Sequence, residues 1–564
     1  MNPLSKLHCT VRNLLNLSVT LLVMLGGPAL VSAQTDCIDG VAENFTCKDI
    51  DLWSHMPLNL LGQGLEGATS NWGWKDLQTG RYYAIQGSFP SEIFVDVTDP
   101  TNPVVVGTMP STTGRPYSRD AETYSNHAFV VADIVGHGMQ VFDLTRLRGI
   151  ESPQTFGPDA LYTDIGGAIN IAINEETGFA YLVSGSGSGE CGGGLHIVDI
   201  RTPKSPTQVA CYGLAGSIND TQCVVYAGPD SDHQGSEICF AAANPQMSTP
   251  NLSIIHVSDK NDIRLLGQTT WPDAGFAHQG WLSEDQRYFL MGDELDELNT
   301  GMNTRTIVLD VSNLESPFYV GSHFADTLTV DHNLYSKGNF VYQANMAVGL
   351  RILRIDNLAA AEFTEVAWFD TLPANDNVSR IYFGAWNVYP FFDNGTLLVS
   401  DTRSGLFMLR ANLGNEFRIN AGLNDAWFNP VTNGQGFLIT VFPDRKEMFL
   451  AWFTFDTERP PEDVTAILGE PGHRWLTAQG PYDGDTAHLT IYMTEGGVFD
   501  DAEPVPSTDQ AGDGSMTLEF ADCTEGLVNY KISSLGISGE IPIQRIVLDN
   551  VPLCESLEEQ LLQK

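Results

Sequence analysis

Seven residues along the chain share one place in a repeated pattern, and their side chains could do chemistry together. Each lies about 22 to 36 residues before the end of a strongly apolar segment, and two of the seven are histidines. Imidazole, carboxylate and amide groups that converge could hold a divalent metal ion or polarise a substrate beside it. They could equally hydrogen-bond to one another and to ordered water in a channel too narrow for a ligand. The seven residues are Trp72, Asp120, Asn170, Asp220, His278, His332 and Trp386.

A second candidate for chemistry is an acidic stretch that follows His278. It comprises Asp293, Glu294, Asp296 and Glu297, with Asn299 and Asn303 after them. Clustered carboxylate and amide oxygens on a loop suit calcium, a hard cation that takes six to eight oxygen ligands. The spacing differs from that of an EF-hand loop, and a solvated acidic loop is the alternative interpretation.

The segment from Phe276 to Gly321 indicates which elements must position these side chains. Four short runs in it are rich in aromatic or β-branched residues, and turn residues separate them. Four such runs in succession predict one antiparallel sheet. A sheet of this size cannot bury both faces alone, so it must stack against copies of itself. The runs are Phe276–Leu282, Arg287–Met291, Arg305–Val311 and Pro317–Gly321.

The third run has seven copies in the chain, which predicts a seven-bladed β-propeller with one four-stranded blade per repeat. In a propeller the first strand of each blade lines the central channel, so the seven candidate residues would meet there. A six-bladed or eight-bladed propeller and two separate sheets are alternatives. The repeated runs end at Asp96, Asp143, Asp199, His256, Asp310, Arg354 and Arg410.

A propeller closes when the two ends of the chain share a blade. Pro57–Gly62 (PLNLLG) is similar to the outer run Pro103–Gly107 (PVVVG), but no inner runs precede it. The sequence therefore predicts Pro57–Gly62 as the outer strand of the last blade.

The chain of 564 residues is too long for one compact domain, and the repeat ends before Ala421. Residues 57–415 are assigned to the propeller, and residues 34–56 form a cysteine-bearing segment before it. Residues 421–554 alternate aromatic and aliphatic positions between Asn-Gly, Asp-Gly and Gly-Gly turns, which predicts a small β-sandwich or barrel. Residues 555–564 are a tail. The aromatic residues Trp427, Trp452, Phe453 and Trp475 are expected in the core of this second domain.

The N-terminal residues Met1–Ala33 predict a secretory signal peptide. Lys6 and Arg12 precede an apolar run, no acidic residue is present, and Val31-Ser32-Ala33 is a small-residue cleavage site. The apolar run is short for a membrane span and no later run reaches the required length, so we expect no integral span in the mature chain. The expected location is extracellular or on a bacterial cell surface, with the periplasm as an alternative.

Eight cysteines follow this segment, and an even number in an oxidising compartment indicates disulfides. Many connectivities are open, of which neighbour pairing is the simplest. Zinc ligation is the rival interpretation, but the sequence has no CxxC spacing. The neighbour pairs are Cys37–Cys47, Cys191–Cys211, Cys223–Cys239 and Cys523–Cys554.

The chain is strongly acidic, with a formal net charge of −41. The electrostatic field of such a chain repels nucleic-acid phosphate and favours cations and cationic partners. We therefore expect that the protein does not bind nucleic acid. Acidity of this kind is also typical of an exported protein adapted for solubility.

Several motifs of the repeated region resemble the choice-of-anchor B family of exported bacterial proteins with LVIVD-type repeats. The resemblance covers roughly Leu52 to Arg410 and implies an exported or surface-displayed propeller with a variable C-terminal attachment. The family pattern has further histidines where this chain has Ile169 and Asn219. The motifs that carry it are Gly136–Leu144, His278–Trp281, Glu284–Leu290, Asp293–Glu297, Asn303–Thr306 and Asp331–Tyr335.

These observations favour a secreted or cell-surface recognition module, with a structural divalent cation such as calcium as a candidate cofactor. Its partner would be an extracellular protein, a glycan or a small molecule. The competing function is a metal-dependent hydrolase or lactonase-like enzyme, with His278 and His332 as ligands and Asp120 or Asp220 as base. Because propellers host both functions, the fold does not decide between them.

Overall fold

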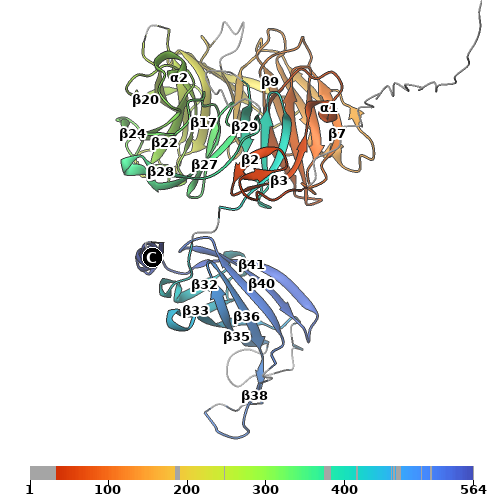
Figure 1. The fold of residues 1–564 in the computed structure, drawn as a ribbon, viewed down its shortest axis with the longest axis vertical. Coiled ribbons are helices and arrows are strands. Elements are labelled where there is room, and N and C mark those ends of the chain that lie inside the picture. Colours follow the sequence, from red (N-terminus) through yellow and green to blue (C-terminus); the bar gives the residue numbers. More distant parts are fainter. Residues whose placement is uncertain are drawn as a thin grey trace, which may run out of the picture. The chain divides into compact units, whose positions relative to one another are not determined.

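The computed structural model describes residues 34–183, 191–246, 248–373, 383–413, 417–458, 460–461, 464, 472–496, 498, 500–508 and 511–562. The predicted signal peptide, residues 1–33, lies outside these residues. The chain divides into two compact units, one up to Asn412 and one from Leu413 (Figure 1).

The first unit is a seven-bladed β-propeller, which confirms the predicted fold. The innermost strands are β4 (Ala68–Asp76), β8 (Arg119–Tyr124), β13 (Asn170–Asn174), β17 (Ser217–Val225), β21 (Ala277–Leu282), β25 (Leu334–Lys337) and β29 (Ala385–Tyr389). The second strands are β5 (Arg81–Ser88), β9 (His127–Ala132), β14 (Phe179–Val183), β18 (Glu237–Asn244), β22 (Tyr288–Asp293), β26 (Phe340–Ala344) and β30 (Leu397–Asp401).

Two further strands complete each blade. The third strands are β6 (Ser91–Asp96), β10 (Met139–Asp143), β15 (Leu195–Asp199), β19 (Asn251–His256), β23 (Arg305–Asp310), β27 (Leu350–Asn357) and β31 (Gly405–Ala411). The outer strands are β7 (Val104–Pro110), β12 (Ala160–Tyr162), β16 (Thr207–Tyr212), β20 (Arg264–Thr269), β24 (Phe318–Phe324), β28 (Glu362–Phe369) and β3 (Ile50–Met56). The short β11 (Gln154–Thr155) adds to β7 in parallel.

The ring is closed by β3, and the prediction for Pro57–Gly62 is wrong. Each innermost strand contacts the next, and β29 contacts β4. Residues Ile50–Met56 pair with β31 as the outer strand of the last blade, whereas Leu58–Leu61 form the short helix α1. Every second side chain of β3 is buried, as expected for a strand with one face against the sheet. The propeller therefore begins at residue 50, inside the segment assigned to 34–56.

The rest of the N-terminal segment extends the sixth blade. Strand β2 (Phe45–Lys48) pairs with β28, and β1 (Val41–Ala42) pairs with β2. All four neighbour disulfides are formed, which confirms the predicted pairing. They are Cys37–Cys47, Cys191–Cys211, Cys223–Cys239 and Cys523–Cys554.

The third strands are apolar because neighbouring blades cover both of their faces. In β15, only Asp199 at the end is incompletely buried. Its Oδ1 accepts a hydrogen bond of 3.0 Å from the backbone N–H two residues later. Asp96, Asp143 and Asp310 make the same bond, so the repeated aspartate ends the strand and begins the turn.

The propeller core consists of separate clusters between adjacent blades. Phe94 stacks on Phe142 at 4.6 Å between the first and second blades, and Phe240 stacks on Phe289 at 5.7 Å between the fourth and fifth. Aromatic pairs at these separations add to the stabilisation that their burial provides. The core therefore holds the ring together blade by blade.

An ion pair between a buried aspartate and a partly exposed arginine also joins the first two blades. Arg148 follows the short helix η1 (Leu144–Leu147) and donates from Nε and Nη2 to both oxygens of Asp76, each at 2.7 Å. The Asp76 side chain is 1% exposed, and the hydrogen bonds from Arg148 lower its pKa to about 2.

We expect Arg148→Ala to lower the free energy of unfolding at neutral pH, because the pKa of Asp76 then returns towards its ordinary value. Since the folded pKa of Asp76 lies below its ordinary value, this contribution is present above about pH 4 and is lost as the pH falls towards 2. Urea unfolding at several pH values measures the difference, which should shrink with acidification. Arg264→Ala, which removes an exposed pair with Asp262, is the control.

The second unit contains a closed eight-stranded antiparallel barrel, one of the two predicted alternatives. Trp427 of the first strand pairs with Arg545 of the last and closes it. The strands are β32 (Asp425–Phe428), β33 (Gly436–Phe442), β34 (Glu447–Phe455), β35 (His473–Asp483), β36 (Thr486–Tyr492), β39 (Gly514–Phe520), β40 (Glu525–Ile532) and β41 (Ile537–Arg545). The hairpin β37 (Thr494–Glu495) and β38 (Ser507–Thr508) lies outside it.

The helices are few and short. In the propeller, α2 (Asp296–Thr300) and η2 (Leu358–Ala360) join α1 and η1, and the barrel unit has η3 (Ala421–Leu423), η4 (Pro430–Thr432), η5 (Pro443–Arg445) and α3 (Val551–Leu562). Helix α3 therefore begins before the tail predicted at 555–564. None of the helices in the described part of the chain is long and apolar enough to cross a membrane.

Candidate metal centre

Six of the seven predicted channel residues lie on innermost strands, and His332 lies two residues before β25. They do not form one group. Trp72, Asp120, Asn170 and Asp220 line a cavity of about 10 Å³ in the channel. His278, His332 and Trp386 do not line this cavity and gather with one another instead.

Bulges at the start of several innermost strands explain this separation. The pairing register of β21 shifts between Ala277 and Gly280, and that of β29 shifts between Ala385 and Asn387. His278 and Trp386 lie inside these bulges. A bulge turns the side chains of neighbouring residues away from the regular alternation of a strand, so equivalent sequence positions reach different levels of the channel.

Many channel side chains also hydrogen-bond to the next blade. Asn219 Nδ2 donates to the carbonyl of His278 at 2.9 Å, and Asn170 Nδ2 donates to the carbonyl of Asn219 at 2.8 Å. Asp120 Oδ2 accepts from the N–H of Ile171 at 3.1 Å. Polar residues at these positions therefore help to hold adjacent innermost strands together, whatever else they do.

The small cavity is acidic. Burial raises the pKa of Asp120, and burial together with repulsion by Asp120 raises the pKa values of Glu122 and Asp220 well above the ordinary range. The residues that line the cavity include no lysine, arginine or histidine. Glu122, which the sequence interpretation missed, lies two residues after Asp120 on the same strand face, and period-two alternation was the signal for it.

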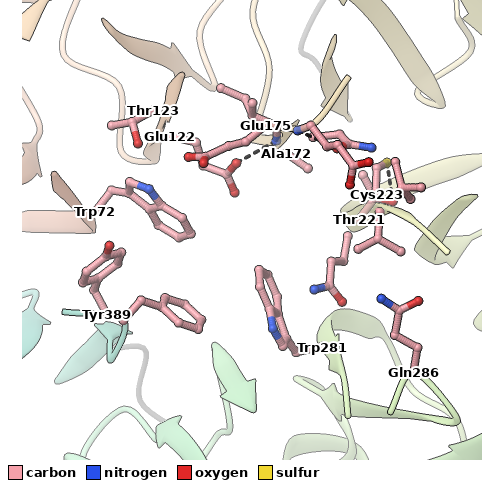
Figure 2. A pocket seen from close by; sticks show the side chains of 17 residues that line it. Trp72, Glu122, Thr123, Ala172, Glu175, Thr221, Cys223, Trp281, Gln286 and Tyr389 are labelled. Atoms are coloured by element: carbon pink, nitrogen blue, oxygen red, sulfur yellow. Dashed lines mark hydrogen bonds between the residues drawn. The ribbon is translucent and has the colours of Figure 1, made fainter. Parts of the chain in front are cut away.

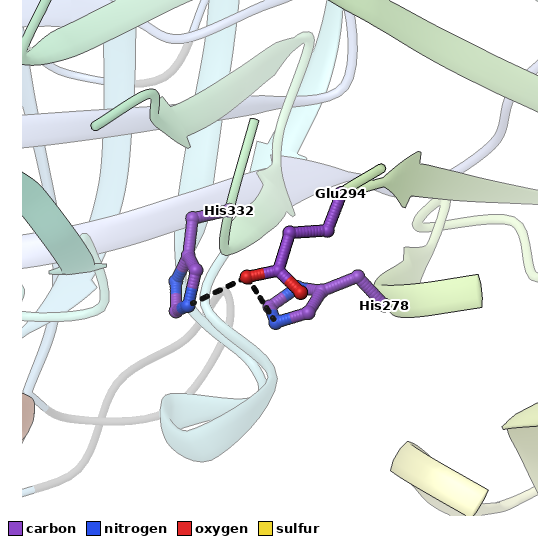
Figure 3. A group of neighbouring side chains, drawn as sticks. All are labelled: His278, Glu294 and His332. Carbon is purple, nitrogen blue, oxygen red and sulfur yellow. Dashed lines mark ion pairs between the residues drawn. The ribbon is translucent and has the colours of Figure 1, made fainter. Parts of the chain in front are cut away.

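His278, His332 and Glu294 form the one group of three ligand-type side chains in the described residues whose ligand atoms all lie within 4.8 Å of one another (Figure 3). Glu294 Oε1 is 3.9 Å from Nε2 of His278 and 3.9 Å from Nε2 of His332. The two imidazole rings are 4.3 Å apart between centroids. Histidines from two adjacent blades therefore face a carboxylate from the end of β22.

The protonation state of His332 is suited to metal binding. Its Nδ1–H donates to the backbone carbonyl of Trp386 at 2.6 Å, which leaves the lone pair on Nε2, the atom that faces Glu294. Burial, followed by repulsion from His278, lowers the pKa of His332 well below its ordinary value. His332 is therefore neutral at physiological pH, the state in which imidazole binds metals.

Asp293 fixes the end of β22, from which Glu294 projects. Its carboxylate accepts from Trp271 Nε1 at 2.8 Å and from the backbone N–H groups of Gly275 and Phe276 at 2.8 and 2.7 Å. Arg305 Nη2 also donates to it at 3.2 Å. The Asp293 carboxylate is thus occupied by structural hydrogen bonds, and its role is to position Glu294.

The remaining acids of the predicted calcium loop point into the blade. Asp296 is buried against Arg305 in an ion pair, and Glu297 is buried beside Asp296 and Asp331. Burial and then the charge of Asp331 raise the pKa of Glu297 to about 11, so Glu297 is protonated at neutral pH. Of the four acids, only Glu294 belongs to the group with the two histidines.

The barrel has a cavity of its own, of about 630 Å³, lined by residues that include Trp452, Trp475 and Tyr530. Trp427 and Trp452 are buried in the barrel core as expected. Phe453 and Trp475 are instead 46% and 59% exposed, because their strand positions alternate with the inward-facing ones.

Comparison with known proteins does not name a relative. No family model matches the chain, and no curated protein matches it. A solved structure titled "Structure of U3-55K" is similar over 64% of this chain and 98% of its own, with 8% sequence identity and a TM-score of 0.40. A similarity this low carries no argument about function.

Proposed function

We propose that the protein is an exported binding propeller of the choice-of-anchor B type, which holds a divalent transition-metal ion at one end of its channel. The observation that carries this proposal is the convergence of His278, Glu294 and His332 within 4.8 Å. His278 lies in β21, Glu294 directly follows β22 and His332 precedes β25, so the fold itself assembles them.

Two imidazole nitrogens and one carboxylate oxygen favour zinc or ferrous iron over calcium, because calcium takes oxygen ligands. Tetrahedral zinc would place its ligand atoms about 3.4 Å apart. Glu294 Oε1 is 3.9 Å from Nε2 of each histidine, and all three ligand atoms lie within 4.8 Å of one another, so side-chain rotations would have to bring them closer. Calcium at the Asp293–Glu297 loop remains a sequence prediction.

General features of the chain support export and a binding function. Four disulfides fit an oxidising compartment, and a rigid propeller presents loops at low conformational cost. The motifs shared with the choice-of-anchor B family favour display outside the cytoplasm, with an extracellular protein, a glycan or a small molecule as the partner.

A metal-dependent hydrolase is the second candidate, because three protein ligands leave a coordination position open for water, as in catalytic zinc sites. The bases suggested by the sequence do not support it. Asp120 and Asp220 line a cavity to which neither histidine contributes. We therefore rank binding above hydrolysis.

Elemental analysis of the purified mature protein tests the metal centre. After equilibration with zinc or ferrous iron and removal of loose ions, we expect one equivalent in the wild type and none in His278→Ala/His332→Ala. Glu294→Gln should weaken zinc binding by more than about 100-fold. His473→Ala/His488→Ala, which removes two exposed imidazoles from the barrel, is the matched control and should keep the metal.

Retention of the metal by His278→Ala/His332→Ala would refute the assignment, and so would the absence of a stoichiometric metal in the wild type. Hydrolysis of esters, lactones or phosphoesters by the loaded protein, lost in Glu294→Gln, would move the conclusion to the second candidate.

A further inference from the structure

A second cavity, of about 530 Å³, lies at the end of the channel opposite the metal centre. The pairing of β21 with β22 fixes this direction, because Ala277 pairs with Asp293 at one end and Leu282 pairs with Phe289 at the other. His278 and Glu294 lie at the first end, whereas Trp281 and Gln286 lie at the second and line the cavity.

Aromatic rings form one wall of this cavity. Trp72, Trp281, Tyr389 and Phe391 line the cavity and come from three blades. Figure 2 shows the rings of Trp72, Tyr389 and Trp281 around the open space. The ring centroids of Trp72 and Tyr389 are 5.1 Å apart, and those of Trp281 and Phe391 are 5.7 Å apart. These contacts fix the rings against one another, so the wall is formed before a ligand arrives.

Carboxylates form the other wall. Glu122, Glu175 and Glu176 line the cavity, and Figure 2 shows Glu122 and Glu175 across the space from Trp281. One oxygen of Glu122 accepts from the N–H of Ile173 at 2.6 Å, which fixes the side chain and leaves its other oxygen with no protein partner among the described residues. No lysine, arginine or histidine belongs to the lining.

The acidic character continues deeper into the channel. The small cavity that contains Asp120 and Asp220 shares Trp72, Glu122, Thr221 and Trp281 with the larger one. These buried carboxyl groups have raised pKa values in the empty channel, and a cation that enters stabilises their ionised forms, whereas an anion does not. The cavity is also larger than a bare metal ion needs and lies in the range of small-molecule sites.

We propose that this cavity binds a small organic cation of the alkylammonium or quaternary ammonium class. Trp72 and Trp281 would contact the alkyl groups through cation–π interactions. Burial raises the pKa values of Glu122 and Glu175 in the empty cavity, so these carboxyl groups would ionise beside the bound cation and neutralise its charge. The proposal is independent of the metal centre. It gives the recognition function a ligand class that the sequence alone did not indicate.

Isothermal titration calorimetry of the full mature chain tests this site. The probes are choline, n-butylammonium and 3,3-dimethylbutan-1-ol, which is a neutral isostere of choline. We expect choline or n-butylammonium to bind with a Kd below about 10 mM, and the neutral isostere to bind at least about tenfold more weakly. Binding should weaken with added salt.

Separate variants test the carboxylate wall and the aromatic wall. Glu122→Gln/Glu175→Gln should weaken cation binding about tenfold or more, and the amide oxygen that Glu122→Gln introduces can still accept from the N–H of Ile173. Trp281→Phe should weaken it less than Trp281→Ala, because phenylalanine keeps a smaller aromatic face. Glu362→Gln, at an exposed position of β28, is the charge control and should bind as the wild type does.

Three outcomes would overturn the proposal. In the first, neither cation binds the wild type in this range. In the second, the neutral isostere binds as tightly as choline, which would indicate an uncharged ligand such as a sugar. In the third, the glutamate and tryptophan variants bind choline unchanged while their melting temperatures match the wild type. Because the metal ligands lie elsewhere, metal content stays at the wild-type value in every one of these variants.

Discussion

Leu52→Asp is expected to unfold the propeller at temperatures where the wild type is fully folded. Leu52 is buried in β3 and pairs with Leu409 in the blade that joins the two ends of the propeller chain. A carboxylate there would lose its hydration without gaining a partner, and the leucine packing would be lost as well. Together these effects should cost more than about 4 kcal/mol.

Differential scanning calorimetry measures this effect, because the barrel is a separate compact unit and should retain its own transition. Val104→Asp is the matched control. It places the same charge on another outer strand, β7, at a position that is 51% exposed. An unchanged propeller transition in Leu52→Asp would show that β3 does not close the ring.

Arg119→Met is expected to lower the free energy of unfolding by about 3–5 kcal/mol at neutral pH, because Glu92 must then either keep a buried, unpaired charge or hold a proton that the unfolded chain releases. Arg119 Nε donates to Glu92 Oε1 at 2.8 Å between the first two blades, and both side chains are almost completely buried. Arg119 also donates to Gln140 at 3.3 Å. The pair is therefore central to a buried polar network.

The unfolding free energy of Arg119→Met should depend on pH with a defined sign. Burial raises the pKa of Glu92, and Arg119 opposes this rise. Without Arg119 the folded pKa rises further, so the folded protein holds a proton that the unfolded chain releases above about pH 4.5. Stability of Arg119→Met should therefore decline as the pH rises from 4.5 towards neutrality.

Guanidinium unfolding at several pH values provides the measurement. Glu92→Met/Arg119→Met should recover most of the lost stability, since an apolar pair of similar volume is often neutral or better than a buried ion pair. Arg115→Ala removes a pair with Glu66 that is exposed on both sides, and it should change stability by less than about 1 kcal/mol. Equal losses for Arg119→Met and Arg115→Ala would contradict the assigned role.

The repeated third strands were predictable because blades cover both of their faces, which leaves a largely apolar run that ends in four of the seven blades with a turn-forming aspartate. The closing strand was missed for the opposite reason. Outer strands have one exposed face, so their pattern is weaker, and PLNLLG matched PVVVG in composition although Leu58–Leu61 form a helix after Pro57. The alternation of the apolar Ile50 and Leu52 with the polar Asp51 was the better signal, and every second side chain of this strand is buried.

The candidate metal centre was predictable in its parts but not as a whole. His278 and His332 follow from the repeat, and Glu294 follows from the acidic loop, but the sequence assigned them to different sites. What joins them is the bulge at His278 together with the network that fixes Asp293 at the end of β22. Both depend on residues distant in sequence, so local patterns do not reveal them.

The most direct test of the proposed metal centre is anomalous diffraction from crystals of the mature protein equilibrated with zinc. Data collected on both sides of the zinc absorption edge should give one strong anomalous peak between Nε2 of His278, Nε2 of His332 and the carboxylate of Glu294, at bonding distance from all three. A zinc peak elsewhere in the molecule, or none at these residues at full zinc loading, would contradict the account.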